Sequence, residues 1–143
     1  MHYVTESLLI GNVEDAQNPP SSIGAVLFLS AEHTIEPPRG IDFAHVPLKE
    51  YGEADPNDVL KAVDWMEEHA PGQRLMVCCR AGIGRSVSII IAYLCCVQGM
   101  PYDEAVTLLK ARRPGATPLP LLEQTIEAVH QLRQDRAASF GSS

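Results

Sequence analysis

The segment from Leu75 to Val97 constrains the fold of this chain more than any other. A short apolar run, Leu75–Cys78, is followed by the glycine-containing loop CRAGIGR and then by Val87–Val97, which is apolar nearly all round. Such a run indicates a buried strand, and an all-apolar helix is typical of the centre of a domain. The order strand, loop, buried helix therefore predicts an α/β layer fold.

Apolar runs and helix signals elsewhere predict the other elements. Asp55 can cap a helix in which Pro56 takes the first position, and Pro71-Gly72 ends it. We expect a central, mostly parallel sheet of about four to five strands flanked by helices, in a single domain over 1–136 with a disordered tail at 137–143. The remaining strands are expected at 7–10, 24–30 and 43–48, and the remaining helices at 103–112 and 121–133.

Composition excludes several classes of protein. The formal charge of −7 disfavours binding to nucleic acid or to an anionic membrane. The four cysteines form two adjacent pairs without metal-ligand spacing, so we expect neither a metal nor another cofactor. No apolar run is long enough to span a bilayer, and the N-terminal residues do not resemble a signal peptide. We therefore expect a cytoplasmic monomer without stable membrane association.

The loop between Cys79 and Arg85 has the composition of an anion site. Gly82 and Gly84 permit the positive φ values with which a short loop can turn its N–H groups inward. These groups and the start of the following helix would bind a tetrahedral oxyanion and favour the thiolate form of Cys79. The Arg85 guanidinium can grip two phosphate oxygens. A thiolate beneath a bound phosphoryl group is placed for nucleophilic attack.

Ser86 has two compatible roles in this scheme. Its hydroxyl can donate to the Cys79 sulfur and make it a better leaving group, or it can cap the helix. Adding the loop itself, the residues predicted to bind phosphate are Arg80, Ala81, Gly82, Ile83, Gly84 and Arg85.

Cys-x5-Arg-Ser between a strand and a buried helix resembles the signature of the cysteine-dependent protein tyrosine phosphatases. VTESLLIGNVEDA resembles the opening strand and helix of their dual-specificity branch, VPLKE its acid loop, and RRPGATP its stretch between the last two helices. The resemblance covers about residues 3 to 130. It implies that 1–136 form a phosphatase catalytic domain that hydrolyses phosphotyrosine and phosphoserine or phosphothreonine in proteins through a phosphocysteine intermediate.

Cys78 departs from the family, which usually has histidine before the nucleophile to hold the loop. A thiol is a weaker hydrogen-bonding group, so we expect a slower enzyme than the family norm. Cys78 is expected to be a small buried residue, with a redox partner that caps oxidised Cys79 as the alternative. Cys95 and Cys96 are expected to pack in the core.

The proton donor is the second departure. The family usually has aspartate where this chain has Glu50, and we expect Glu50 to be the general acid, with Asp55 and Glu53 as the alternatives. These three residues and Asp58 could also form a solvated acidic loop. Leu119 stands where the family often has an asparagine that supports the site, so this contact is expected to be absent or supplied elsewhere.

Four other functions are alternatives to this interpretation. Arg80 resembles the basic residue of some phosphoinositide phosphatases, although the other loop positions are uncharged. The departures at Cys78, Glu50 and Leu119 are compatible with a weakly active phosphate-binding module. A rhodanese-type sulfurtransferase also has a Cys-Arg loop, but that loop is usually one residue shorter, and VPLKE and RRPGATP would be unexplained. Arsenate reduction would need a set of relay cysteines, and the sequence offers no suitable one.

Overall fold

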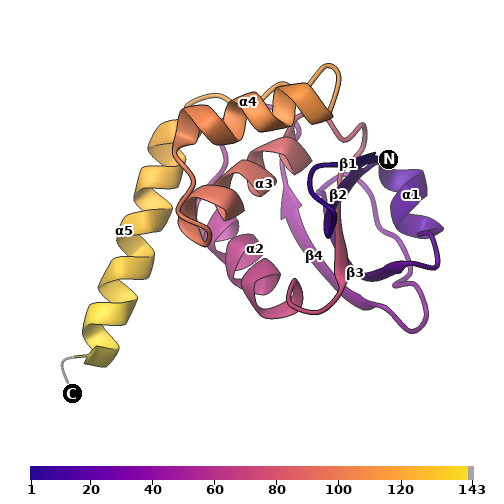
Figure 1. Ribbon diagram of the computed structural model, residues 1–143, viewed down its shortest axis with the longest axis horizontal. Helices are drawn as coiled ribbons and strands as arrows, with labels where there is room; N and C mark the ends of the chain where they lie inside the picture. Colours follow the sequence, from indigo (N-terminus) through magenta and orange to yellow (C-terminus); the bar gives the residue numbers. More distant parts are fainter. Residues whose placement is uncertain (142–143) are drawn as a thin grey trace.

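Five strands form one sheet in the order β1-β2-β5-β3-β4, and Figure 1 labels four of them, β1 to β4. The computed structural model describes residues 1–141. Neighbouring strands run parallel except for the pair β1 and β2, so the prediction of a mostly parallel sheet of four to five strands is confirmed. The strands are β1 His2–Tyr3, β2 Leu8–Gly11, β3 Ile23–Ser30, β4 Asp42–Leu48 and β5 Arg74–Cys78.

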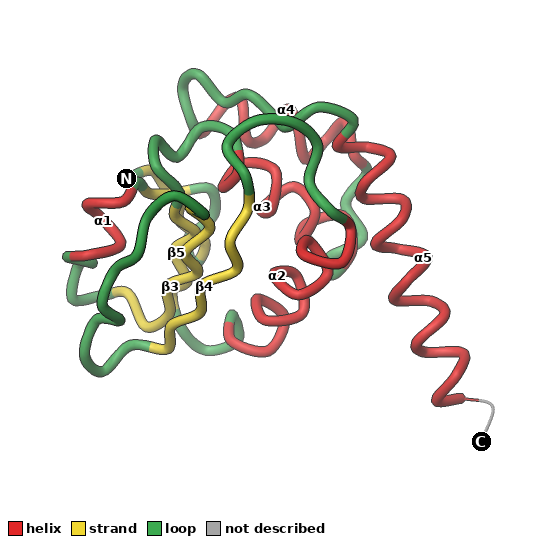
Figure 2. The backbone as a smooth tube through the Cα atoms, turned by 180° about the vertical axis from the view of Figure 1, so that it is seen from behind, coloured by secondary structure: helices red, strands yellow, loops and turns green. Residues whose placement is uncertain are grey.

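Helices cover both faces of the sheet. The short α1 lies against one face, whereas α2, α3 and the C-terminal helices lie on the other (Figures 1 and 2). Within residues 1–141, no helix is long and apolar enough to cross a membrane. The helices are α1 Val13–Gln17, α2 Pro56–His69, α3 Arg85–Cys96, α4 Tyr102–Arg112 and α5 Leu122–Gly141.

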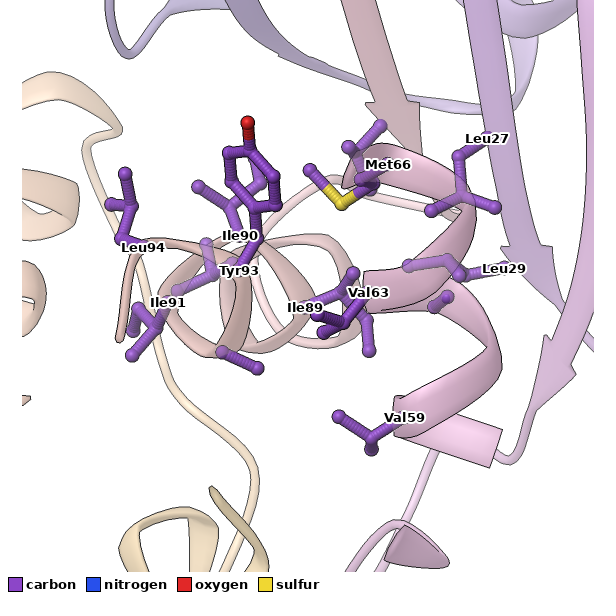
Figure 3. Packing of buried hydrophobic residues seen from close by; sticks show 14 of the residues in the cluster. Leu27, Leu29, Val59, Val63, Met66, Ile89, Ile90, Ile91, Tyr93 and Leu94 are labelled. Carbon is purple, nitrogen blue, oxygen red and sulfur yellow. The ribbon is translucent and has the colours of Figure 1, made fainter. Parts of the chain in front are cut away.

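The larger core lies between the sheet and α3. Every residue of α3 except Cys96 is buried, as its nearly uniform apolar sequence predicts. Burial on all sides fixes the position of the helix start, which follows the cysteine loop directly. Figure 3 shows side chains of this core from β3, α2 and α3, namely Leu27, Leu29, Val59, Val63, Met66, Ile89, Ile90, Ile91, Tyr93 and Leu94.

The start of α2 follows the sequence prediction. The Asp55 side chain accepts a hydrogen bond of 2.8 Å from the backbone N–H of Asn57, and Pro56 takes the first helical position. Val59, Ala62, Val63 and Met66 form its buried face. Asp55 is therefore a helix cap, which leaves it less free for chemistry at the loop.

The end of α5 differs from the prediction. The sequence predicts a disordered tail over 137–143, whereas α5 continues to Gly141, so the prediction is wrong for 137–141. Residues 142–143 lie outside the described part of the chain. Arg136 is fixed by Asp64, with an Nη1–Oδ2 distance of 2.6 Å, and the two alanines that follow are strong helix formers. The helix therefore projects beyond the body of the domain (Figures 1 and 2).

Leu121 occupies a position that suits glycine. Its φ is 56°, and it directly precedes α5, where its carbonyl accepts from the N–H of Thr125. Left-handed backbone costs an L-residue about 1–2 kcal/mol, and leucine is a poor N-cap. We expect Leu121→Gly to raise the free energy of unfolding by about 1 kcal/mol in urea denaturation. Leu121→Ala retains the Cβ and serves as the control. Equal stability of the two variants would contradict the assigned strain.

Candidate active site

The cysteine loop closes the carboxyl end of β5, which lies between β2 and β3 in the sheet. Carboxyl ends of parallel strands meet at one edge, where α/β proteins bind ligands. A cavity of about 370 Å³ opens there, and both Cys79 and Arg85 line it. Cys79 is 2% and Arg85 is 3% exposed, so both lie deep in the site. The two predicted reactive residues are thus brought together.

Arg113 holds two carbonyls of the loop from outside. Its Nη2 donates to the oxygen of Ala81 at 3.1 Å, and its Nε donates to the oxygen of Gly82 at 3.0 Å. Arg113 follows α4 directly in the chain, so the segment between α4 and α5 supports the loop. No signal in the sequence reasoning identified this residue.

The carbonyls of Arg80 and Ile83, on either side of those of Ala81 and Gly82, also point away from the cavity. The oxygen of Arg80 accepts from the N–H of Val13 at 3.5 Å, and that of Ile83 accepts from the N–H of Thr117 at 2.7 Å. In a planar trans peptide, the next N–H points opposite to the carbonyl. Four successive outward carbonyls therefore turn the N–H groups of 81–84 inward, as an anion nest requires. The Gly82 N–H indeed donates to Cys79 Sγ at 3.2 Å.

The two loop glycines have different roles. Gly82 has a φ of 71°, and a Cβ there would lie 2.8 Å from the oxygen of Gly11. Gly82 is buried and does not line the cavity, whereas the other predicted phosphate-binding residues do. The prediction of positive φ at Gly84 is wrong, because its φ is −116° and it already forms the N-cap of α3. One glycine is enough for the turn.

Glu32 is a site residue that the sequence analysis missed. It lies just after β3, and its two carboxylate oxygens accept from Arg85 Nη1 at 2.6 Å and Nη2 at 2.9 Å. Nη1 also donates to the oxygen of Leu48 at 3.0 Å. Of the five N–H groups of arginine, the Nε–H and one Nη2–H remain for a ligand. Glu32 therefore orients Arg85 for two-point binding of an oxyanion.

We expect Glu32→Gln to lower kcat/KM for a small aryl phosphate by about tenfold to a hundredfold, because Arg85 loses its orientation. Glu36→Gln changes an exposed glutamate of the same loop and serves as the control. Steady-state kinetics at neutral pH measure the effect. Equal rates in the two variants would show that Arg85 needs no positioning by Glu32.

The same ion pair has a pH signature. Hydrogen bonds from Arg85 lower the pKa of Glu32 from 4.5 to about 2. A depressed carboxyl pKa contributes stability above the unfolded-state pKa, and this stability is lost as the pH falls from 4.5 towards 2. Glu32 is 36% exposed, so solvent screening limits the contribution to about 1 kcal/mol. The stability difference from Glu32→Gln should disappear over that pH range.

Serine side chains near the start of α3 have distinct environments. Ser86 is not the helix cap, because Gly84 holds that position without any side-chain bond. The buried Ser86 hydroxyl has no hydrogen-bond partner among the described residues. Ser88 Oγ donates to the oxygen of Gly84 and accepts from the backbone N–H of Leu119, both at 2.8 Å. The backbone N–H of Leu119 thus makes a hydrogen bond to α3 at the position where the family often has an asparagine side chain.

Glu50 lines the cavity with Cys79, whereas its two alternatives do not. Its carboxylate lies 3.2 Å from Arg80 Nη2, and both side chains are partly exposed. Glu53 and Asp55 instead line a separate hollow beside α5. Of the three candidate acids, the structure brings only Glu50 into the cavity of the nucleophile.

Cys78 and Cys79 face opposite sides of the sheet. Cys78 packs in a small core under α1, whereas Cys79 belongs to the larger core and the cavity. Burial raises the pKa of Cys78 well above 9.0, so it stays a thiol. This confirms a small buried residue and provides no route to a redox cap on Cys79. Cys95 is buried and Cys96 is half-buried.

Comparison with known proteins agrees with this site. A family model described as the dual specificity phosphatase catalytic domain matches residues 11–136. The chain belongs to this family, within the cysteine-dependent protein tyrosine phosphatases.

Curated relatives and solved structures are similar to this chain. Mouse dual specificity protein phosphatase 15 is 43% identical over 75 residues, covering 49% of this chain and 32% of the mouse protein. Human dual specificity protein phosphatase 22 is 26% identical over 153 residues, covering 100% of this chain and 83% of the human protein. The crystal structure of human DUSP28 has a TM-score of 0.81 at 20% identity, with 95% and 99% of the two chains covered. The chain thus spans about a third of the mouse relative.

Proposed function

We propose that the protein is a cysteine-dependent phosphatase that hydrolyses phosphotyrosine and phosphoserine or phosphothreonine in proteins. The observation that carries the proposal is the loop itself, with Cys79 beneath inward N–H groups and a buried Arg85. Two donors of Arg85 and the loop amides complement the equatorial oxygens of a phosphoryl group. Membership of the dual specificity phosphatase family supports this proposal over sulfur transfer.

The proposed reaction has two steps. The Cys79 thiolate attacks phosphorus, the S–P bond forms, and the ester P–O bond breaks while Glu50 gives a proton to the leaving oxygen. Water then attacks phosphorus, Glu50 takes its proton, and the S–P bond breaks to release phosphate. The Ser86 hydroxyl donates to the departing sulfur, a role supported by its lack of another partner within the described residues.

We also propose that residues 1–136 form the catalytic domain, and that the protein acts as a cytoplasmic monomer on phosphorylated proteins. The formal charge of −7 supports the absence of nucleic acid and of stable membrane association.

Phosphate release tests the proposal. The reduced, purified chain is given peptides with phosphotyrosine, phosphoserine or phosphothreonine, and a phosphoinositide in parallel. Acid quench during turnover should trap one phosphoryl group on Cys79, detected by peptide mass spectrometry. Hydrolysis of the phosphoinositide alone would favour a lipid phosphatase. Phosphate binding without turnover of any ester would instead identify a weakly active binding module.

A further inference from the structure

The lining of the cavity is largely apolar. We call the side chains of Tyr51, Ile83, Pro118, Leu119 and Pro120 the apolar rim, since all of them line the cavity around the deep Cys79. Tyr51 is 81% and Ile83 is 36% exposed, and exposed apolar side chains that gather at one cavity often mark a binding surface. These residues come from three segments far apart in the sequence. Their convergence on one opening marks it as a binding surface.

Few basic residues line the cavity. Two of the lining residues are basic, Arg80 and Arg85. Arg80 lies 3.2 Å from Glu50, and Arg85 is held by both oxygens of Glu32. Beyond the phosphate that Arg85 can grip, a second phosphate or an acidic side chain would meet Arg80 alone among the basic lining residues, with the Glu50 side chain beside it. The overall charge of −7 adds repulsion.

We infer that this site selects singly phosphorylated phosphotyrosine segments whose neighbouring residues are apolar, over acidic or doubly phosphorylated segments. The inference rests on the proposed phosphatase function. Phosphotyrosine has an apolar ring between its phosphate and its backbone, which matches a deep nucleophile below apolar walls. Residues beside it would then cover the exposed ring of Tyr51. An anionic lipid surface has apolar chains too, but it is recognised by clusters of basic residues, whereas two arginines line this cavity.

A peptide series of one length tests this selectivity. Each peptide contains one phosphotyrosine flanked by leucine and valine, by serine and asparagine, or by aspartate and glutamate, and a fourth contains a second phosphate. Free phosphotyrosine reports the basal reaction. We expect kcat/KM for the apolar peptide to exceed that for the acidic one by about tenfold, through burial of apolar surface on the rim.

Tyr51→Ser removes the most exposed part of the rim. The ratio of apolar to acidic kcat/KM should fall from about tenfold to about twofold, whatever happens to the absolute rates. Tyr3→Ser is the matched control, since Tyr3 is 49% exposed and lines a different hollow. It should leave both the ratio and the basal rate unchanged.

Failure of this inference is distinguishable from failure of the proposed function. Hydrolysis of free phosphotyrosine with equal rates for apolar and acidic peptides would overturn the selectivity alone. The same conclusion would follow if a doubly phosphorylated peptide, or a phosphoinositide in phosphatidylcholine vesicles, were the best substrate. An unchanged ratio in Tyr51→Ser would overturn the role of the rim. No hydrolysis of any ester would overturn the phosphatase function and, with it, the selectivity.

Discussion

Replacing Cys79 by serine is expected to abolish phosphate release, with kcat/KM reduced by about 10⁴-fold or more. A serine hydroxyl at this depth has no adjacent general base among the described loop residues, whereas the Cys79 sulfur, a better nucleophile than a hydroxyl oxygen, accepts the Gly82 N–H at 3.2 Å. The variant retains the loop, so it should still bind the phosphopeptide. Kinetics with a phosphotyrosine peptide and calorimetric titration of the same peptide measure the two properties.

Cys78→Ser is the matched control, because the adjacent thiol lies on the other face of the sheet. It should retain most of the turnover and lose stability through a buried, poorly satisfied hydroxyl. Full activity of Cys79→Ser together with loss of activity in Cys78→Ser would exchange the two assignments. Comparable activity in all three proteins would exclude cysteine chemistry.

Glu50→Gln is expected to lower kcat by about 10²–10⁴-fold on a phosphotyrosine peptide, since the leaving phenoxide would lack a proton donor. The deficit should shrink for aryl phosphates with electron-withdrawing substituents, whose leaving groups need less protonation. Measurement of kcat for a phosphotyrosine peptide and for a series of substituted phenyl phosphates tests both expectations.

Glu53→Gln provides the comparison, because Glu53 lies in the same segment but lines the hollow beside α5. It should leave both kcat and the leaving-group dependence unchanged. A large loss in Glu53→Gln with little loss in Glu50→Gln would move the general acid along the segment. A uniform deficit across all leaving groups in Glu50→Gln would mean that Glu50 acts through Arg80 rather than as an acid.

Local signals were sufficient for the parts of the site that are contiguous in sequence. Cys79 and Arg85 are separated by five residues, and the strand before them and the apolar helix after them fix the direction of the loop. The cap at Asp55 was predictable for the same reason. The expectation at Gly84 failed because composition shows that a turn is possible, without showing which residue makes it.

Local sequence signals could not predict contacts between residues that lie far apart in the sequence. Glu32 meets Arg85 across 53 positions, and Arg113 reaches the loop across 31. A signal did exist for Glu32, because a charged residue follows the buried β3, whose carboxyl end adjoins that of β5 in a parallel sheet. Arg113 offered no such signal, since an arginine after a helix is most often a solvated side chain.

The attachment of the loop by Arg113 and Thr117 links ligand affinity to the stability of a remote segment. The loop is ordered by contacts that form during folding, so its conformational entropy is lost before any ligand arrives. By thermodynamic reciprocity, a bound oxyanion that needs this ordered loop must in turn protect the segment between α4 and α5 from local unfolding. Ligand binding to the loop and local unfolding of that segment are therefore coupled equilibria, and each shifts the other by the same free energy.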